Sequence, residues 1–126
     1  MTHVLGERDL ASTLPLGSED AFPEVFATSR MVALMEICSA RLMKAVVPAG
    51  KLSVGVGVDV THLAATPAGE TVRAVATFLG MDGRLFRFNV EVFDRGGMVG
   101  RATHTRAVVD GLRLLDGARR RMAEAR

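Results

Sequence analysis

The sequence predicts an α+β fold in which a curved antiparallel β-sheet wraps around one long helix. Two observations predict it. The first is a single helix-like segment, about residues 28–47, that is apolar on most of its sides, and such a helix has to be covered. The second is a series of four β-like segments joined by short turns, and successive strands of this kind lie antiparallel as neighbours. A curved sheet is therefore the expected cover for the helix.

The N-terminal part of the chain leads into that helix. Residues 1–22 are weakly patterned, with a short strand expected in "HVLGERDL" and a loop in "TLPLGSEDAFP". The helix is predicted from Thr28 to Val47, where Pro48 and Gly50 stop it. At about 100° per residue, one stripe faces the core and contains Met31, Leu34, Met35, Cys38 and Leu42. Arg30, Arg41 and Lys44 lie on the solvent side.

The strands follow in order. "SVGVGVDVTHL" alternates with a period of two, which places four valines (Val54, Val56, Val58 and Val60) on one face, with His62 in the same register unless a bulge intervenes. "ETVRAVATFL", "RLFRFNVEVF" and "MVGRATHTRAVVD" are the next strands, with "DRGG" as a hairpin turn. The tail "GLRLLDGARRRMAEAR" reads as an arginine-rich helix. Residues 1–126 therefore form one domain with the hotdog arrangement.

Composition narrows the classes of function. The chain has 48% hydrophobic residues, 16 Lys and Arg against 14 Asp and Glu, and no Trp or Tyr, which disfavours a nucleic-acid partner. No run of about 18 apolar residues is present, so we expect no membrane partner. Charges near the N-terminus argue against a signal peptide, and the single Cys38 suits a reducing compartment, so a cytoplasmic location is expected. Three widely spaced histidines predict no metal site, and we expect no cofactor.

One carboxylate in the predicted helix needs an explanation. Glu36 has no Lys or Arg at the positions three or four residues away. Burial of an ionised carboxylate costs several kcal/mol unless it finds hydrogen-bond donors. Glu36 therefore either reaches water or a partner chain, or it has a functional role.

Three further polar residues have ordinary structural interpretations. Thr28 lies at the predicted helix start, where a threonine commonly serves as the N-cap. His62, in the valine register, is read as a core or strand-end residue bonded to backbone. His104 is interpreted as a residue of the sheet surface. None of these residues alone indicates a function.

Together they match a known family. "FPEVFATSRMVALMEICSARLM" followed by "SVGVGVDVTHLAATPAGETV" resembles the fluoroacetyl-CoA thioesterase family of hotdog proteins, from about Phe22 to Val72 and more loosely through "ATHTRAVV". The resemblance implies a catalytic set of Thr28, Glu36 and His62. It also implies Gly55 as a substrate-binding residue on the strand beside the thioester. Under this hypothesis Glu36 lacks a helical partner because Thr28, His62 and the substrate are its partners.

One position departs from the family pattern. In the fluoroacetyl-specific enzyme, two phenylalanines three residues apart close the pocket. Phe22 matches the second as a substrate-binding residue, but Glu19 stands at the first. A charged residue cannot form that apolar lid, so the expected activity is hydrolysis of short-chain acyl-CoA thioesters with an open, less selective pocket.

The partner expected from these residues is an acyl-CoA, and the assembly expected is a homodimer. A five-stranded sheet around one helix leaves an edge strand and an apolar flank open, and a two-fold partner covers both. Two alternatives are a non-catalytic acyl-CoA-binding or regulatory hotdog module and an enzyme of other chemistry on this fold, such as a hydratase. Intact Thr28, Glu36 and His62 argue against the first, and the missing Asp/His pairing of hydratases argues against the second.

Overall fold

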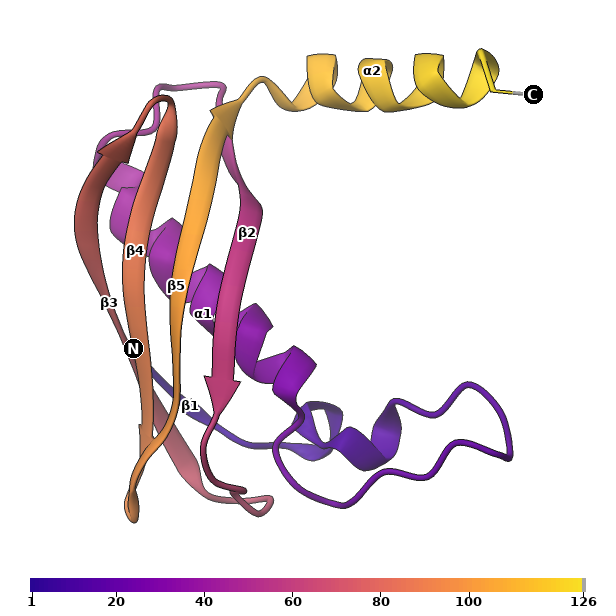
Figure 1. The fold of residues 1–126 in the computed structure, drawn as a ribbon, viewed down its shortest axis with the longest axis vertical. Helices are drawn as coiled ribbons and strands as arrows, with labels where there is room; N and C mark the ends of the chain where they lie inside the picture. Colours follow the sequence, from indigo (N-terminus) through magenta and orange to yellow (C-terminus); the bar gives the residue numbers. More distant parts are fainter. Residues whose placement is uncertain (126) are drawn as a thin grey trace.

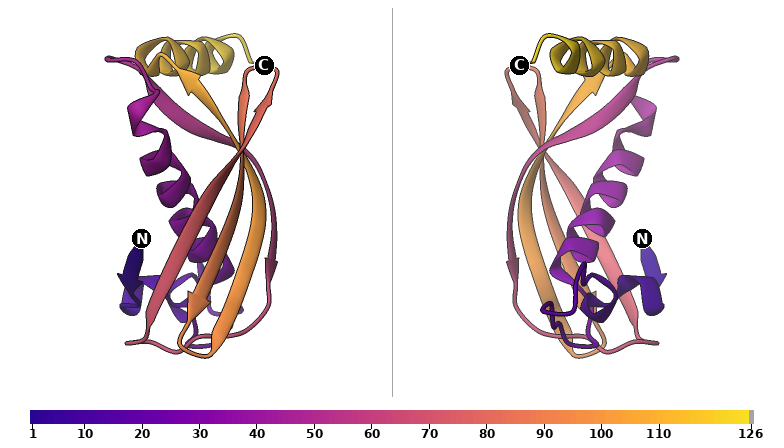
Figure 2. Two further views of the ribbon diagram at one scale, coloured as in Figure 1. Left: turned by 90° about the vertical axis from the view of Figure 1, so that its left-hand side faces the viewer. Right: turned by 90° about the vertical axis from the view of Figure 1, so that its right-hand side faces the viewer.

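A curled antiparallel sheet wraps around one helix, as the sequence predicts (Figures 1 and 2). The structure is a computed structural model and describes residues 1–125. Its helices are α1 (Thr28–Leu42) and α2 (Gly111–Ala123), and its strands are β1 (Thr2–Val4), β2 (Leu52–His62), β3 (Thr71–Asp82), β4 (Leu85–Asp94) and β5 (Gly97–Val109). None of the helices in residues 1–125 is long and apolar enough to cross a membrane.

The strand order differs from the predicted one in the place of β2. The sheet runs β1-β3-β4-β5-β2, so β2 pairs with β5 and lies at the edge, whereas consecutive pairing placed it beside β3. The segment of residues 63–70 is long enough to cross from one side of the sheet to the other, and it is fixed on the way. Phe26 N donates to Thr66 O at 2.8 Å, and Val25 forms an isolated bridge with Pro67. The connection thus passes under the start of α1.

The helix α1 is held by a single buried stripe. Met31, Leu34, Met35 and Cys38 are buried at the spacing of one helix face, against a cluster from the sheet that includes Val72, Phe88, Val90 and Val99. The prediction for Leu42 is wrong, because this side chain is 50% exposed.

The end of α1 also differs from the prediction. The helix ends at Leu42, and a 3₁₀ turn (Met43–Ala45) takes the place of its expected last residues. Tightening of this kind at a helix end satisfies carbonyl groups that lack intrahelical donors, here just before Pro48.

The two hairpins of the sheet depend on glycine. Gly83 (φ 59°) lies between β3 and β4, and Gly97 (φ 128°) begins β5 after the predicted "DRGG" turn. Both have positive φ, which residues other than glycine rarely adopt. These turns keep β3, β4 and β5 as one continuous meander.

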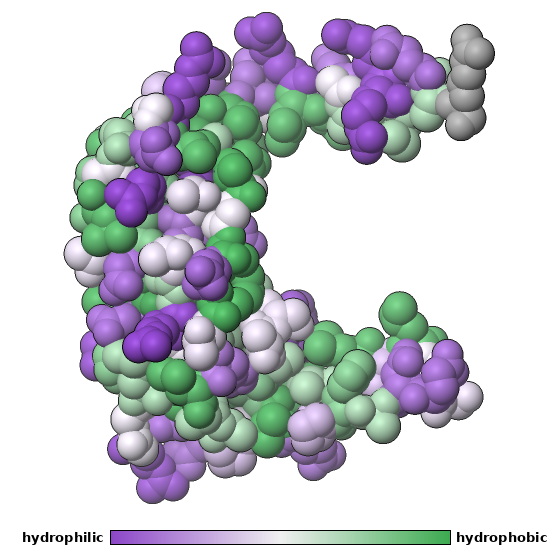
Figure 3. Space-filling view, viewed as in Figure 1, coloured by the Kyte–Doolittle hydropathy of each residue, from purple (hydrophilic) through white to green (hydrophobic). Residues whose placement is uncertain are grey.

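The helix α2 leaves the body of the protein. It follows β5 directly, and its N-cap Asp110 accepts hydrogen bonds from the backbone of Leu112 and Arg113. It projects away from the sheet on the same side as the loop that precedes α1, so the two enclose a concave space beside β2 (Figure 1). Apolar atoms lie along this concave edge and on the underside of α2 (Figure 3).

Candidate active site

Thr28 and His62 form a direct pair at the start of α1. Thr28 Oγ1 lies 2.8 Å from His62 Nδ1. The N-cap of α1 is Ala27, with no side-chain cap, so the interpretation of Thr28 as the N-cap is wrong. Because Thr28 is the first residue of the helix itself, its hydroxyl is available to the histidine on β2.

The second nitrogen of His62 has no partner among residues 1–125. His62 Nε2 is buried and has no hydrogen-bond partner within the described residues, and the Phe26 ring packs edge-on to the imidazole with centroids 6.2 Å apart. Buried polar atoms without partners are rare and often mark functional positions. The imidazole therefore has one nitrogen oriented by Thr28 and one available for a further hydrogen bond.

A surface pocket of about 420 Å³ opens at this pair, and its lining includes Thr28, His62, Phe26 and the segment 63–65. Phe22 lies outside the lining residues and is 51% exposed. Glu19 is exposed as well. The loop that carries both residues thus leaves this pocket open within one protomer.

Glu36 lies elsewhere on the helix, and its partner comes from the far end of the chain. Arg106 on β5 places Nη1 3.2 Å from Glu36 Oε1. The Glu36 side chain is 43% exposed, whereas that of Arg106 is 7% exposed. A buried guanidinium needs a counter-charge, and Glu36 supplies it. This ion pair explains why no cation is needed beside Glu36 on its own helix.

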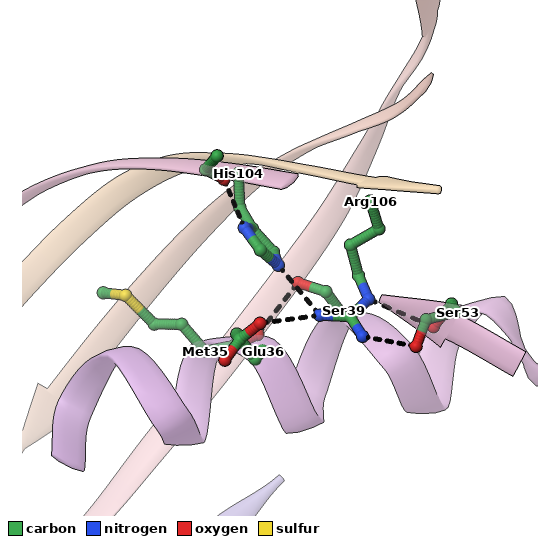
Figure 4. A network of polar contacts seen from close by, with 7 residues as sticks. Met35, Glu36, Ser39, Ser53, His104 and Arg106 are labelled. Carbon is green, nitrogen blue, oxygen red and sulfur yellow. Dashed lines mark hydrogen bonds and ion pairs between the residues drawn. The ribbon is translucent and has the colours of Figure 1, made fainter. Parts of the chain in front are cut away.

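Arg106 belongs to a polar network under the sheet (Figure 4). Its Nε donates to Ser53 Oγ at 3.1 Å, its Nη2 donates to Ser53 O at 3.0 Å, and its Nη1 lies 3.1 Å from His104 Nε2. His104 is 2% exposed, so its interpretation as a sheet-surface residue is wrong. Ala102, His104 and Arg106 alternate along β5 on the face that covers α1, where all three are buried.

A β-bulge in β2 shapes the surroundings of Glu36. The pairing of β2 with β5 shifts between Gly55 and Gly57, so Val56 is an extra residue on β2. After the bulge, Val58 and Val60 pair with the inward-facing His104 and Ala102, and His62 keeps their register. Before it, the inward face belongs to Ser53 and Gly55, so the prediction that Val54 shares a face with Val58 and Val60 is wrong.

Gly55 is the residue that the bulge places against Glu36. A Cβ at Gly55 would collide with the Glu36 carboxylate. Any larger residue would therefore displace the carboxylate or the strand. The position predicted as a substrate-binding glycine is thus in contact with the predicted catalytic acid.

The three predicted catalytic residues form two centres within a protomer. Thr28 and His62 are in contact, whereas Glu36 lies eight residues along α1, about 12 Å at 1.5 Å per residue. Its hydrogen bond goes to Arg106 and not to Thr28 or His62. Arg106 and His104, which the sequence did not indicate, complete the second centre.

The titration of His104 gives a prediction about stability. Burial lowers the pKa of His104, and the adjacent Arg106 guanidinium lowers it further. In the unfolded chain the imidazole binds a proton below about pH 6.5. Between that pH and the lower pKa of the folded state, the unfolded chain holds the extra proton, so stability falls as pH falls.

We therefore expect the melting temperature of the protein to fall from pH 7 to pH 5 more steeply than that of His104→Gln, which cannot titrate at this position. Calorimetry at several pH values measures both slopes. Equal slopes would show that His104 makes no contribution to the acid sensitivity of the fold.

The curled sheet around α1 defines a hotdog protein, and comparison with known proteins specifies its class and family. The model of the fluoroacetyl-CoA-specific thioesterase family matches residues 7–111, so the chain belongs to that family. The fluoroacetyl-CoA thioesterase of Streptantibioticus cattleyicolor is 43% identical over 88 residues, which are 70% of this chain and 63% of that protein. The match thus spans less than two thirds of the relative's length.

Solved structures agree over nearly the whole chain. A variant of the fluoroacetyl-CoA-specific thioesterase in complex with fluoroacetate and CoA has a TM-score of 0.87 at 34% identity and covers 96% of both chains. A thioesterase superfamily member from Thermus thermophilus has a TM-score of 0.83 at 22% identity, covering 98% of this chain and 88% of that one. The second likeness concerns the fold alone.

Proposed function

We propose that this protein hydrolyses short-chain acyl-CoA thioesters and that Thr28, Glu36 and His62 carry the reaction. The observation that supports this most strongly is the Thr28–His62 hydrogen bond at the pocket, with His62 Nε2 left unpaired. A hydroxyl–imidazole pair of this kind can pass a proton to or from a bound substrate. Relatives solved with CoA, fluoroacetate or acetyl-CoA support the substrate class.

Hydrolysis adds water across the thioester, giving a carboxylic acid and free CoA thiol. Glu36 supplies the carboxylate that either takes a proton from the attacking water or attacks the carbonyl carbon itself. His62, oriented by Thr28, handles the proton that the departing thiolate needs. The strand at Gly55 allows the backbone to approach the thioester carbonyl, which is the kind of contact that stabilises a developing oxyanion.

The experiment for this proposal is a panel of acyl-CoA substrates, from acetyl to short branched and halogenated acyl groups, with free CoA measured by a thiol reagent. We expect multiple turnovers on the short members of the panel. A protein that releases no CoA from any of them would contradict the proposal. Mass spectrometry of a rapidly quenched reaction separates the two roles of Glu36, because direct attack leaves an acyl group on this residue.

We also propose a homodimer formed through β2. This strand has 11 residues and lies at the free edge of the sheet. Val56 is 56% exposed and Val58 is 42% exposed. An exposed apolar edge of this length is unusual in a monomer. The apolar residues of α2, namely Leu112, Leu114, Leu115 and Met122, are also exposed, on a helix that projects past the same edge (Figure 3).

The dimer also bears on the separation between the two centres. Antiparallel pairing of two β2 strands about their middle places the Gly55 end of one beside the His62 end of the other. Within one strand these two residues are seven positions apart, about 23 Å at 3.3 Å per residue. In this pairing, His62 therefore lies closer to Glu36 of the partner subunit than to Glu36 of its own chain. We infer that each active site combines Thr28 and His62 with the Glu36 of the partner subunit.

This arrangement predicts that two inactive variants complement each other. We expect Glu36→Gln and His62→Gln each to retain at most about a hundredth of the parent rate. Their mixture after subunit exchange should regain up to about a quarter of the parent rate, because half of the dimers are mixed and each has one intact site. Light scattering should give twice the 13.5 kDa chain mass. A stable monomer would contradict the dimer, and a dimer without complementation would contradict the shared site.

The state of the one cysteine indicates the cellular location. Cys38 is free and buried, as is usual for proteins of reducing compartments. We propose that the protein works in the cytoplasm.

A further inference from the structure

We propose that His104 is a positioning residue, which as a neutral imidazole with its proton on Nδ1 holds the Arg106 guanidinium against Glu36. This inference rests on the proposed role of Glu36 in hydrolysis. It assigns a task to a buried histidine that the reaction itself does not use. The three side chains lie together between α1 and β5 (Figure 4).

The partners of His104 determine which of its nitrogens carries the proton. Nδ1 lies 2.7 Å from the carbonyl oxygen of Gly57, and a carbonyl can only accept, so Nδ1 must be the donor. Nε2 lies 3.1 Å from Arg106 Nη1, and a guanidinium can only donate, so Nε2 must be the acceptor. The two contacts together require the neutral ring with its proton on Nδ1.

The surroundings of the ring favour that neutral form. His104 is 2% exposed and pairs across the sheet with Val58 on β2 and Phe88 on β4. The charged groups nearest to it are Arg106 on its own strand and Glu36 on α1, and Arg106 is the one that it contacts directly. A second proton, on Nε2 in addition to Nδ1, would remove the acceptor and place two cations against each other.

Arg106 connects His104 to Glu36. Its Nε and Nη2 are held by Ser53, at 3.1 Å and 3.0 Å, and its Nη1 has two hydrogens, which serve His104 Nε2 and Glu36 Oε1. Because the guanidinium is planar, fixing three of its nitrogens fixes the direction of the N–H bond to the carboxylate. The loss of the His104 acceptor would allow that N–H bond to turn away from Glu36.

The β-bulge explains why the chain can hold His104 in this way. The extra residue Val56 separates Gly55, which contacts Glu36, from Gly57, whose carbonyl accepts the hydrogen bond of His104 Nδ1. One irregularity in β2 therefore supplies both the space for the carboxylate and the acceptor that selects the histidine tautomer.

A matched pair of substitutions separates the two hydrogen bonds of the ring. His104→Asn keeps a donor near the position of Nδ1 but provides no acceptor for Arg106. His104→Gln reaches the position of Nε2 and can accept from Arg106. We expect His104→Asn to lower kcat by about 10- to 100-fold, the range found for residues that orient a catalytic group, with little change in KM. We expect His104→Gln to recover most of that loss.

Thr103→Asn is the control, because Thr103 lies next to His104 on β5 but on the opposite, exposed face of the sheet. It should behave as the parent does. Equal kcat values for the parent and His104→Asn would overturn the inference, and so would equal losses in His104→Asn and His104→Gln. A parent that hydrolyses no acyl-CoA would instead contradict the proposed function.

A double-mutant cycle tests whether His104 acts through Glu36. If it does, His104→Asn should have little further effect in the Glu36→Gln background, whereas a general structural defect would lower the rate by the same factor in both backgrounds.

Should His104→Asn not fold, imidazole ¹⁵N NMR of the parent protein at pH 7 gives the protonation of both ring nitrogens without a substitution. Protonated Nδ1 and bare Nε2 are expected, and the opposite tautomer or a doubly protonated ring would overturn the inference.

Discussion

Replacement of Glu36 by glutamine is expected to lower turnover of short acyl-CoA substrates by about 100-fold or more, which is the loss typical of a missing general base or nucleophile. The substitution keeps the shape of the side chain and an oxygen for Arg106, but it removes the negative charge. We expect KM to change little, because the role proposed for the carboxylate is at the reacting carbonyl and not at the CoA portion of the substrate.

The fold should survive this change with a lower melting temperature. Arg106 is nearly buried and would lose the charge of its partner, although the 43% exposure of Glu36 weakens the effect of the pair on stability. Circular dichroism and thermal melting of Glu36→Gln provide the control. A folded Glu36→Gln protein that hydrolyses acyl-CoA at the parent rate would show that the site assignment is wrong.

The second large effect concerns the selection of the acyl group. We propose that the parent protein discriminates only modestly between fluoroacetyl-CoA and acetyl-CoA, because Glu19 stands where the family resemblance implies a lid phenylalanine. Glu19 is exposed, and Phe22 is 51% exposed and lies outside the lining of the Thr28–His62 pocket. The small contacts available to a single group in a pocket change discrimination by about 10- to 200-fold.

The measurement is kcat/KM for both substrates in the parent and in Glu19→Phe. We expect the preference for fluoroacetyl-CoA to rise in Glu19→Phe, as a second ring excludes water and small polar groups from the pocket. Glu19→Gln is the matched control, because it removes the charge without adding an apolar ring. A parent preference above about a thousandfold would mean that selectivity needs no second lid phenylalanine.

The main elements of the fold follow from patterns that lie close together in the sequence. The buried stripe of Met31, Leu34, Met35 and Cys38 on α1 is a local pattern and is as predicted, whereas the predicted alternation along β2 holds only after its bulge. The position of β2 is not local. Its pairing with β5 depends on a connection, residues 63–70, whose course is fixed by contacts of Thr66 and Pro67 with the segment before α1.

The candidate site, like the fold, could be predicted only in part from the sequence. The resemblance grouped Thr28 with His62, and the two are in contact, whereas their joint role in a reaction stays a prediction. The bulge at Val56 was not predictable, because the alternation of glycine and valine in "SVGVGVDV" looks uninterrupted. A shift of one residue exchanges the two faces of a strand, and here it brings Gly55, and not a valine, against Glu36.

Arg106 was missed because ion pairs between distant segments leave no local pattern. It lies 70 positions from Glu36 in the chain. The available signal was the alternation of Ala102, His104 and Arg106 on one face of a strand, which could have suggested that the two polar residues are buried beside a carboxylate. Whether that face is covered depends on the curl of the sheet around α1.

Measurement of binding and turnover of acetyl-CoA in the same preparation of the parent protein is the decisive test of the proposed hydrolysis. Calorimetry gives the affinity, and release of free CoA gives the number of turnovers per site. We expect the protein to bind acetyl-CoA and to release CoA over many turnovers. Saturable binding of acetyl-CoA without release of CoA would contradict the proposed hydrolysis and would identify a non-catalytic acyl-CoA-binding module.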